Sequence, residues 1–210
     1  MPRCLKTPSI RSSCNGIDVV GFPNLGAPGF DFETWDLCAT LVTEINMPAL
    51  TLQMTSLLSR LRESAATAPS LNALERGIVK AIAEQLPHYN WTGFYMLDPG
   101  DPVTLVLGAF VGDPTPHTRI PVTQGICGAA AASGQTVVVD DVNADPRYLS
   151  CSLKTNSEIV VPIYARGKVV GEIDIDSHAP AAFTEIDRQF LEETARIVGS
   201  FIERHCGESN

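Results

Sequence analysis

Apolar residues recur at helical spacing in two consecutive segments that begin near residue 50. The first segment carries them from Leu50 to Leu61 and the second from Leu71 to Ile82, with Pro69 between the two. A stripe that repeats every three to four residues is typical of an amphipathic helix, which buries one face against a core. The sequence therefore predicts two successive helices in this part of the chain.

A third helix is predicted close to the C-terminus. Thr184 stands three residues before Asp187, in the way that a capping residue precedes an acid of the first helical turn. An apolar stripe follows, made of Ile186, Phe190, Ile197, Phe201 and Ile202. We expect this helix to close the fold and to bury its stripe in the core.

Between these helical segments the pattern changes to short runs rich in β-branched and aromatic residues, which favour strands. Five candidate strands span residues 91–97, 103–110, 136–139, 158–164 and 169–175. The last two are joined by residues 165–168, a connection short enough for a hairpin. That pair is therefore predicted to be antiparallel.

Helices, then a meander of strands, then a helix describe an α+β domain. We predict an antiparallel sheet of about five to six strands, with helices packed on one face and long loops on the other. The longest connection, residues 140–157, contains Pro146, Tyr148 and Cys151. Loops of this length in a compact domain are either functional or disordered, and these residue types favour function.

The N-terminal region has a different composition from the rest of the chain. Residues 1–46 are rich in Gly, Pro, Ser and Asn and show neither a helical nor a strand period. We predict a low-complexity, flexible extension over residues 1–46 and a folded domain over residues 47–210.

Composition excludes several classes of partner. Hydrophobic residues make up 44% and charged residues 19% of the chain, which is close to the average for folded soluble proteins. The formal charge of −9 disfavours a surface that must neutralise phosphates, so we expect neither nucleic acid nor a membrane as partner. The sequence contains no apolar run approaching the roughly 18 to 20 residues of a membrane span and no secretory signal, and we expect a cytoplasmic protein.

Motifs for metals and cofactors are missing from the sequence. No two cysteines form a C-x-x-C pair, and their number is too small for a disulfide scaffold. His117, His178 and Cys151 lack a metal-ligand spacing, and no glycine-rich phosphate-binding motif occurs. We predict no metal and no cofactor. The six cysteines are Cys4, Cys14, Cys38, Cys127, Cys151 and Cys206.

Six short motifs carry a resemblance to a known family. They are NWTGFY (90–95), RIP (119–121), GICG (125–128), DDV (140–142), NSEIVVP (156–162) and DIDS (174–177). Their order and spacing resemble those of the free methionine-(R)-sulfoxide reductases, which are built on a GAF domain. The resemblance covers about residues 50–203. It implies a GAF fold and the reduction of free L-methionine (R)-sulfoxide to methionine, and we expect thioredoxin as reductant and a homodimer formed through helices.

A sulfoxide reductase needs a thiolate that attacks sulfur and a second thiol that releases the oxidised cysteine as a disulfide. The resemblance makes Cys151 the attacking residue and Cys127 the resolving one, provided that their Cα atoms come within about 7 Å. The family usually has a third cysteine ten residues before the Cys127 position, where this chain has His117. A packing role for Cys127 and a solvated loop position for His117 are the alternatives.

Three acids are candidates for the substrate pocket. Asp174 and Asp176 lie two apart on a strand and therefore share one face. Burial of these acids near Glu158 should raise at least one pKa, which would leave a protonated acid for the sulfoxide oxygen and an ionised one for the substrate ammonium. The resemblance supports all three acids without dividing these tasks between them, and a solvent-exposed acidic strand face is the alternative.

Two aromatic residues complete the candidate pocket. Trp91 and Tyr95 lie four apart and so share one face of the first strand. The resemblance implies that they enclose the methylthio end of the substrate, while ordinary core packing is the alternative. Backbone amides around Ser150 and Cys151 are candidates for holding the substrate carboxylate.

Two other functions fit the same residues. A GAF domain with this pocket could bind methionine, its sulfoxide or another small amine as a signal without turning it over. A disulfide between Cys127 and Cys151 could instead act as a thiol redox switch that reshapes the long loop for a protein partner.

Overall fold

The structure is a computed structural model, and it describes residues 49–150 and 152–205 of the 210-residue chain. The predicted N-terminal extension lies outside the described residues. The elements follow one another in the order α1 (Leu52–Thr67), α2 (Leu71–Gln85), β1 (Trp91–Asp98), β2 (Asp101–Val111), β3 (Arg119–Pro121), α3 (Gly125–Ser133), β4 (Val137–Val139), η2 (Val142–Ala144), β5 (Ser157–Ala165), β6 (Lys168–Ser177) and α4 (Glu185–His205).

The strands form one antiparallel sheet in the order β3-β2-β1-β6-β5-β4. The predicted hairpin is confirmed between β5 and β6. Its two central residues, Arg166 and Gly167, have φ angles of 51° and 73°. Positive φ at both positions is typical of the two-residue turns whose twist matches that of the flanking strands. The hairpin places β6 at the centre of the sheet, between β1 and β5.

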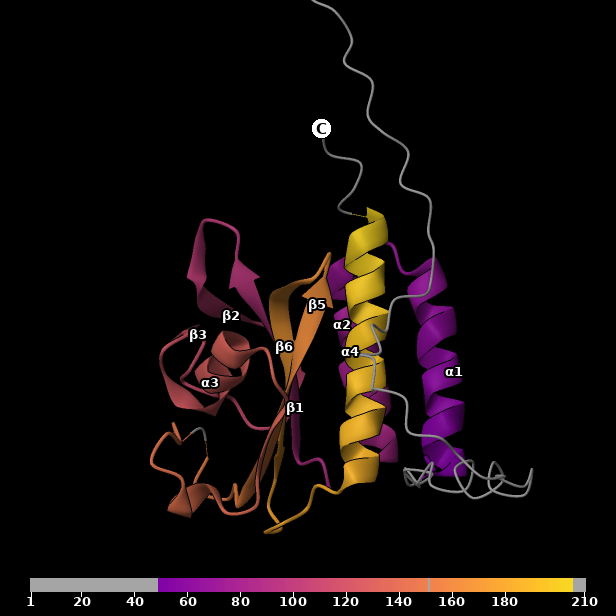
Figure 1. Cartoon of the computed structure of the whole chain (residues 1–210). Coiled ribbons are helices and arrows are strands. Elements are labelled where there is room, and N and C mark those ends of the chain that lie inside the picture. Colours follow the sequence, from indigo (N-terminus) through magenta and orange to yellow (C-terminus); the bar gives the residue numbers. More distant parts are fainter. Residues whose placement is uncertain (1–48, 151, 206–210) are drawn as a thin grey trace, which may run out of the picture. The chain divides into compact units, whose positions relative to one another are not determined.

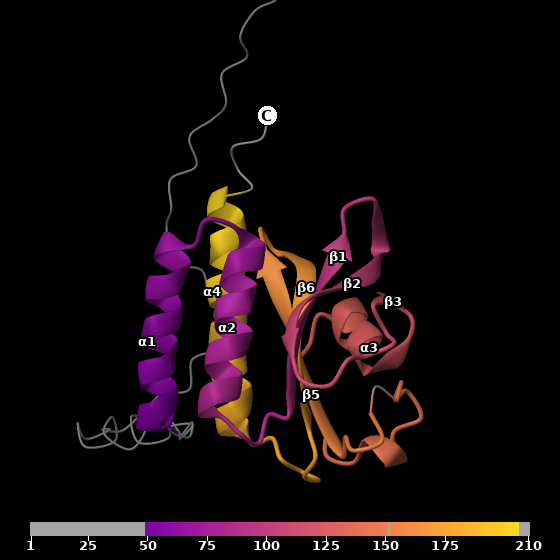
Figure 2. The same cartoon turned by 180° about the vertical axis from the view of Figure 1, so that it is seen from behind.

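The sheet divides the domain into two layers. Helices α2 and α4 cover one face and α1 packs on the outside of these two helices, while α3 lies on the other face (Figures 1 and 2). The main core lies beneath the three helices, where Phe94, Ile173 and Ile175 of the sheet are fully buried. The predicted α+β architecture with helices on one face is confirmed. Among the described residues, no helix has the length and apolar character that a membrane crossing requires.

Side-chain caps fix where the helices begin. Thr51 Oγ1 accepts a hydrogen bond from the Met54 amide at the start of α1, and Ser70 Oγ does the same for Ala73 in α2. At α4, Asp187 Oδ2 accepts hydrogen bonds from both the amide and the hydroxyl of Thr184, at 2.8 Å and 2.6 Å. The start of the closing helix is therefore confirmed.

The sequence reasoning missed α3 and β3. Helix α3 has the sequence GICGAAAAS, in which small residues replace the apolar stripe of an amphipathic helix. Small residues suit close packing here: a Cβ atom at Gly128 would lie 2.9 Å from the carbonyl oxygen of Pro121. Strand β3 has only three residues, too few for a period-2 pattern to be recognised.

The buried carboxyl of Glu75 should make the stability of the fold depend on pH. Glu75 on α2 is 3% exposed, and burial raises its pKa from 4.5 to about 7 although the Ala109 amide donates a hydrogen bond to it. A raised pKa means that the folded state binds more protons than the unfolded state, so the free energy of unfolding falls as pH rises from about 4.5 through 7.

Glu75→Gln should remove the part of this dependence that Glu75 contributes. We expect the variant to match the wild type near pH 4.5 and to exceed its free energy of unfolding at pH 8 by about 1–3 kcal/mol. Urea denaturation at the two pH values measures the difference. An equal deficit of the variant at both values would contradict the titration of Glu75.

Candidate active site

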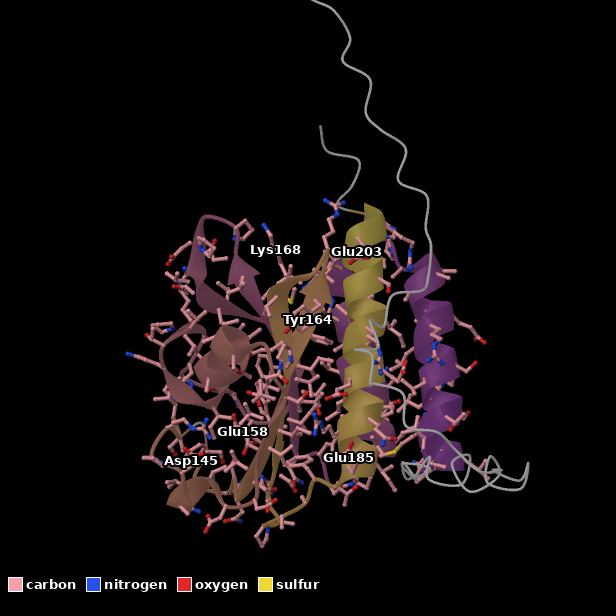
Figure 3. The ribbon with its side chains drawn as sticks, viewed as in Figure 1. Asp145, Glu158, Tyr164, Lys168, Glu185 and Glu203 are labelled. Atoms are coloured by element: carbon pink, nitrogen blue, oxygen red, sulfur yellow. The ribbon has the colours of Figure 1, made fainter. Side chains whose placement is uncertain are left out.

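Strand pairing brings the predicted acids and aromatics onto one patch of the sheet. On the central strand β6, Asp176 lies directly opposite Trp91 of β1 on one side and Glu158 of β5 on the other. Asp174 follows two residues earlier on the same face. This face is turned toward α3, away from the three-helix layer, and Figure 3 shows Glu158 on that side. Residues distant in the sequence therefore meet on three adjacent strands.

The three predicted acids are buried. Glu158, Asp174 and Asp176 are 6%, 3% and 4% exposed, which rules out the solvent-facing alternative. Burial and the neighbouring carboxylates Asp174 and Asp176 raise the pKa of Glu158 well above its usual range. Burial, together with Asp176, likewise raises the pKa of Asp174, and burial raises that of Asp176 to about 7. Part of this cluster is therefore protonated at neutral pH.

A fourth acid, Glu172, belongs to the same patch and was missed from the sequence. It precedes Asp174 by two residues on β6, lies opposite Tyr95, and is fully buried. Among residues 49–150 and 152–205, neither of its carboxyl oxygens has a hydrogen-bond partner. Burial raises its pKa well above the usual range and the charge of Asp174 adds to this, while the nearby Cys127 thiol opposes it. The period-2 rule that paired Asp174 with Asp176 would also have found Glu172.

Cys127 contacts the acid cluster from α3. Its thiol is 6% exposed and donates a hydrogen bond to Asp174 Oδ2 at 3.4 Å. Burial and the negative charges of Asp174, Glu172 and Glu158 raise its pKa well above the usual range, so the residue is a neutral thiol at neutral pH. Cys151, the predicted attacking residue, lies outside the described residues.

Cys127, Glu158 and Asp174 also offer a thiol and two carboxylates within 4.8 Å of one another. Such donors could hold a divalent cation. These residues come from α3, β5 and β6, so their spacing in the sequence does not indicate a metal site. The sequence assigned no metal, and that assignment stays a prediction.

The aromatic pair forms one wall of the patch. The rings of Trp91 and Tyr95 are stacked with centroids 6.3 Å apart, and the rings of Trp91 and Phe110 are stacked with centroids 5.6 Å apart. Trp91 Nε1 donates a hydrogen bond to the Asp113 carbonyl at 3.1 Å, and the Tyr95 hydroxyl donates one to the His117 carbonyl at 2.7 Å. These bonds hold the segment after β2 against the patch.

The position of Trp91 depends on Gly93, and this gives a test. A Cβ atom at Gly93 would overlap the Trp91 indole and lie 3.1 Å from Phe110 Cβ. Gly93→Ala should therefore lower the free energy of unfolding by about 1–3 kcal/mol, as overpacking does. Gly77→Ala is the matched control, because nothing lies within 4 Å of a Cβ atom there and alanine favours the helix. Equal urea midpoints for Gly93→Ala and wild type would contradict this position of the indole.

His117 lies beside the long loop between β4 and β5. Its Nε2 atom is 3.3 Å from the carbonyl oxygen of Ser150, the residue that precedes Cys151 in the sequence. The His117 side chain is half-buried, so it is not the fully solvated loop residue of the alternative interpretation. The structure therefore brings the position of the expected third cysteine next to the loop that carries the predicted attacking residue.

A cavity of about 180 Å³ opens beside Asp176 and Trp91. The segment after β2 contributes Gly112, Asp113 and Thr115 to its lining, and the long loop contributes Ser152, Lys154 and Thr155. Asn90 and His178 complete it. The cavity gives a small ligand access to the edge of the acid cluster and to the indole.

The sequence model of the GAF domain matches residues 56–202, which is more than half of the chain. The chain belongs to the GAF domain family. In this GAF domain the acids, Cys127 and the aromatic wall occupy the sheet face opposite the three-helix layer. The match agrees with the fold and confirms the GAF domain in the resemblance noted from the six motifs.

Proteins from bacteria and yeast are similar to this GAF domain. Protein YtsP of Bacillus subtilis is 46% identical over 117 residues, covering 56% of this chain and 71% of the relative. The free methionine-R-sulfoxide reductase of Saccharomyces cerevisiae is 41% identical over 110 residues, covering 52% of this chain and 61% of the relative. The chain thus spans less than two thirds of the yeast enzyme.

A solved structure extends the likeness over more of the chain. The free methionine-R-sulfoxide reductase from Neisseria meningitidis, solved in complex with its substrate, is 35% identical with a TM-score of 0.69. The match covers 73% of this chain and 91% of that one. This GAF domain is therefore similar to that enzyme in sequence and in fold over almost the whole of the enzyme.

Proposed function

We propose that this GAF domain reduces free L-methionine (R)-sulfoxide to methionine. The observation that carries the proposal is the gathering of Cys127, the buried acids and the aromatic wall on one patch of the sheet, with Asp176 and Trp91 of that patch lining a cavity. Sequence and fold similarity to enzymes named free methionine-R-sulfoxide reductase supports it. The substrate is an amino acid with one cationic and one apolar end, and the site offers a complement to each.

The acids would bind the ammonium group and supply a proton. Several carboxyl groups this close together cannot all be ionised in a buried site, so protonated and ionised acids coexist. An ionised member attracts the substrate ammonium, while a protonated member can donate to the sulfoxide oxygen as the sulfur–oxygen bond breaks. Trp91 and Tyr95 would enclose the methylthio end with apolar surface.

Two thiols would carry the electrons. Cys151 attacks the sulfoxide sulfur, the oxygen passes to the cysteine as a sulfenic acid, and methionine leaves as a thioether. The Cys127 thiol then attacks the sulfenic sulfur and forms a disulfide, and the hydroxyl leaves as water with the thiol proton. The dithiol of thioredoxin reduces this disulfide and becomes oxidised in turn.

The environment of Cys127 supports this division of roles. A thiol whose pKa is raised by burial and by acidic neighbours is a poor first nucleophile, because the thiolate is the attacking form. Resolution tolerates a slower thiol, since the sulfenic acid would form on the same chain and the attack would be intramolecular. We further propose that the protein works in the cytoplasm and as a homodimer formed through helices.

A coupled thioredoxin assay on the purified full chain tests the function. We expect NADPH consumption and methionine formation with the free (R)-sulfoxide and none with the (S)-form. An absence of methionine from the (R)-form, with thioredoxin and its reductase active on a known reductase, would refute the proposal.

A sensor is the second candidate, and His117 is the observation that favours it. The chain has histidine where the similar reductases usually carry a third redox cysteine, which would impair recycling of the oxidised enzyme. A domain that keeps the cavity and the acids could then respond to methionine or its sulfoxide by binding alone. Calorimetry that detects binding of the sulfoxide to a protein without turnover would favour this function.

A further inference from the structure

An ion pair bridges two segments at the cavity beside Asp176. Lys154, in the loop before β5, places its Nζ 3.2 Å from Oδ2 of Asp113, in the segment after β2. Both residues line the cavity. Their side chains are 66% and 68% exposed, so solvent screens the pair and it contributes little stability. Lys154 can therefore exchange this partner for another anion at low cost.

The cavity is charged in a way that suits a zwitterion. Asp176 and the acids behind it attract the cationic end of a ligand. A free amino acid also carries a carboxylate, which gains most from a cationic hydrogen-bond donor. The basic side chains on the cavity lining are those of Lys154 and His178. Lysine presents three donors at the end of a long flexible side chain, so Lys154 is better suited than His178 to reach a ligand carboxylate.

We propose that Lys154 leaves Asp113 when substrate enters and binds the substrate carboxylate, so that it determines selectivity for the free amino acid. In a peptide, methionine sulfoxide has an amide in place of that carboxylate and an amide in place of its ammonium. Such a substrate would lose the Lys154 contact and would leave the buried acids without their cation. The inference rests on the proposed function for its kinetic consequence, although the binding contact itself does not require turnover.

The kinetic test compares Lys154→Met with wild type on two substrates, free L-methionine (R)-sulfoxide and its methyl ester, which lacks the carboxylate charge. For the free acid we expect the KM of the variant to rise about 10- to 50-fold, the loss typical of a hydrogen bond to a charged group, with kcat changed less than about threefold. For the ester we expect the two proteins to be alike. Lys154→Arg should retain much of the preference for the acid.

Controls separate this contact from a general loss of positive charge. Lys168→Met removes an exposed lysine at the start of β6, and Figure 3 places Lys168 toward the opposite end of the sheet from Glu158. We expect wild-type KM for this control. His178→Gln removes the other basic side chain on the cavity lining. A rise in KM with His178→Gln but not with Lys154→Met would overturn the proposal.

Calorimetry with L-methionine and its methyl ester tests the same contact without turnover. We expect Lys154→Met to weaken methionine binding about 10- to 50-fold and to leave ester binding unchanged. An equal preference for the acid over the ester in both proteins would overturn the proposal and would assign the carboxylate to the backbone amides near Ser150. If wild type binds methionine through Lys154 but turns over neither sulfoxide, the reductase function fails while this contact stands.

Discussion

The Cys127→Ser variant should form one equivalent of methionine from the free (R)-sulfoxide and then stop. Serine cannot attack the sulfenic acid, so the first oxidation remains possible and the disulfide does not form. We expect the steady-state rate with thioredoxin to fall by about 100-fold or more, while the rapid first turnover stays close to that of wild type. Rapid-quench measurement of methionine, followed by the coupled assay, separates the two phases.

Matched cysteine variants distinguish the attacking cysteine from the resolving one. Cys151→Ser should lose the first turnover as well, because it removes the proposed attacking sulfur. Cys206→Ser, which lies beyond the six motifs, should behave as wild type in both phases. Full steady-state activity in Cys127→Ser, with an unchanged melting temperature, would reduce Cys127 to a packing residue. In that case the hydrogen bond from Cys127 to Asp174 would have no role in catalysis.

Glu158→Gln should lower kcat/KM for methionine sulfoxide reduction by about 100- to 1,000-fold. The glutamine side chain keeps the size of glutamate but can neither carry a negative charge for the ammonium nor give up an acidic proton. Glu158 lies directly opposite Asp176, the acid that lines the cavity, so we expect both tasks to be sensitive to it. Steady-state kinetics with both sulfoxide and thioredoxin varied measures the loss.

Glu63→Gln is the matched control for this substitution. Glu63 is exposed on α1, in the helical layer on the far face of the sheet, and we expect wild-type kinetics for it. Removing one of several repelling buried carboxylates should also raise the free energy of unfolding of Glu158→Gln at pH 8. A loss of activity shared equally by Glu158→Gln and Glu63→Gln would argue against a pocket role for the buried acid.

Local periodicity was sufficient to predict most of this fold. The five candidate strands agree with β1, β2, β4, β5 and β6 within about two residues at each end, because each carries β-branched residues in a run with clear breaks. The start of the closing helix followed from the capping residue Thr184. The two-residue repeat of a strand predicted that Asp174 and Asp176 share one face of β6. The structure buries both carboxyl groups on that face.

Tertiary contacts supplied what the sequence could not. Helix α3 has almost no apolar periodicity, so only its packing against the sheet shows that Cys127 reaches Asp174. Glu172 lacks a place in the motifs that carry the resemblance, and its chemistry arises from complete burial. Lys154 and Asp113 are 41 residues apart, and only the fold brings their charges together at one cavity.

Counting free thiols in the full chain after oxidation tests the central claim most directly. Reduced protein is mixed with excess free L-methionine (R)-sulfoxide, and the remaining thiols are titrated and the peptides mapped by mass spectrometry. The account predicts the loss of two sulfhydryls per polypeptide and a linked pair of peptides containing Cys127 and Cys151. Oxidation of a different pair, or no loss of thiols while methionine accumulates, would contradict it.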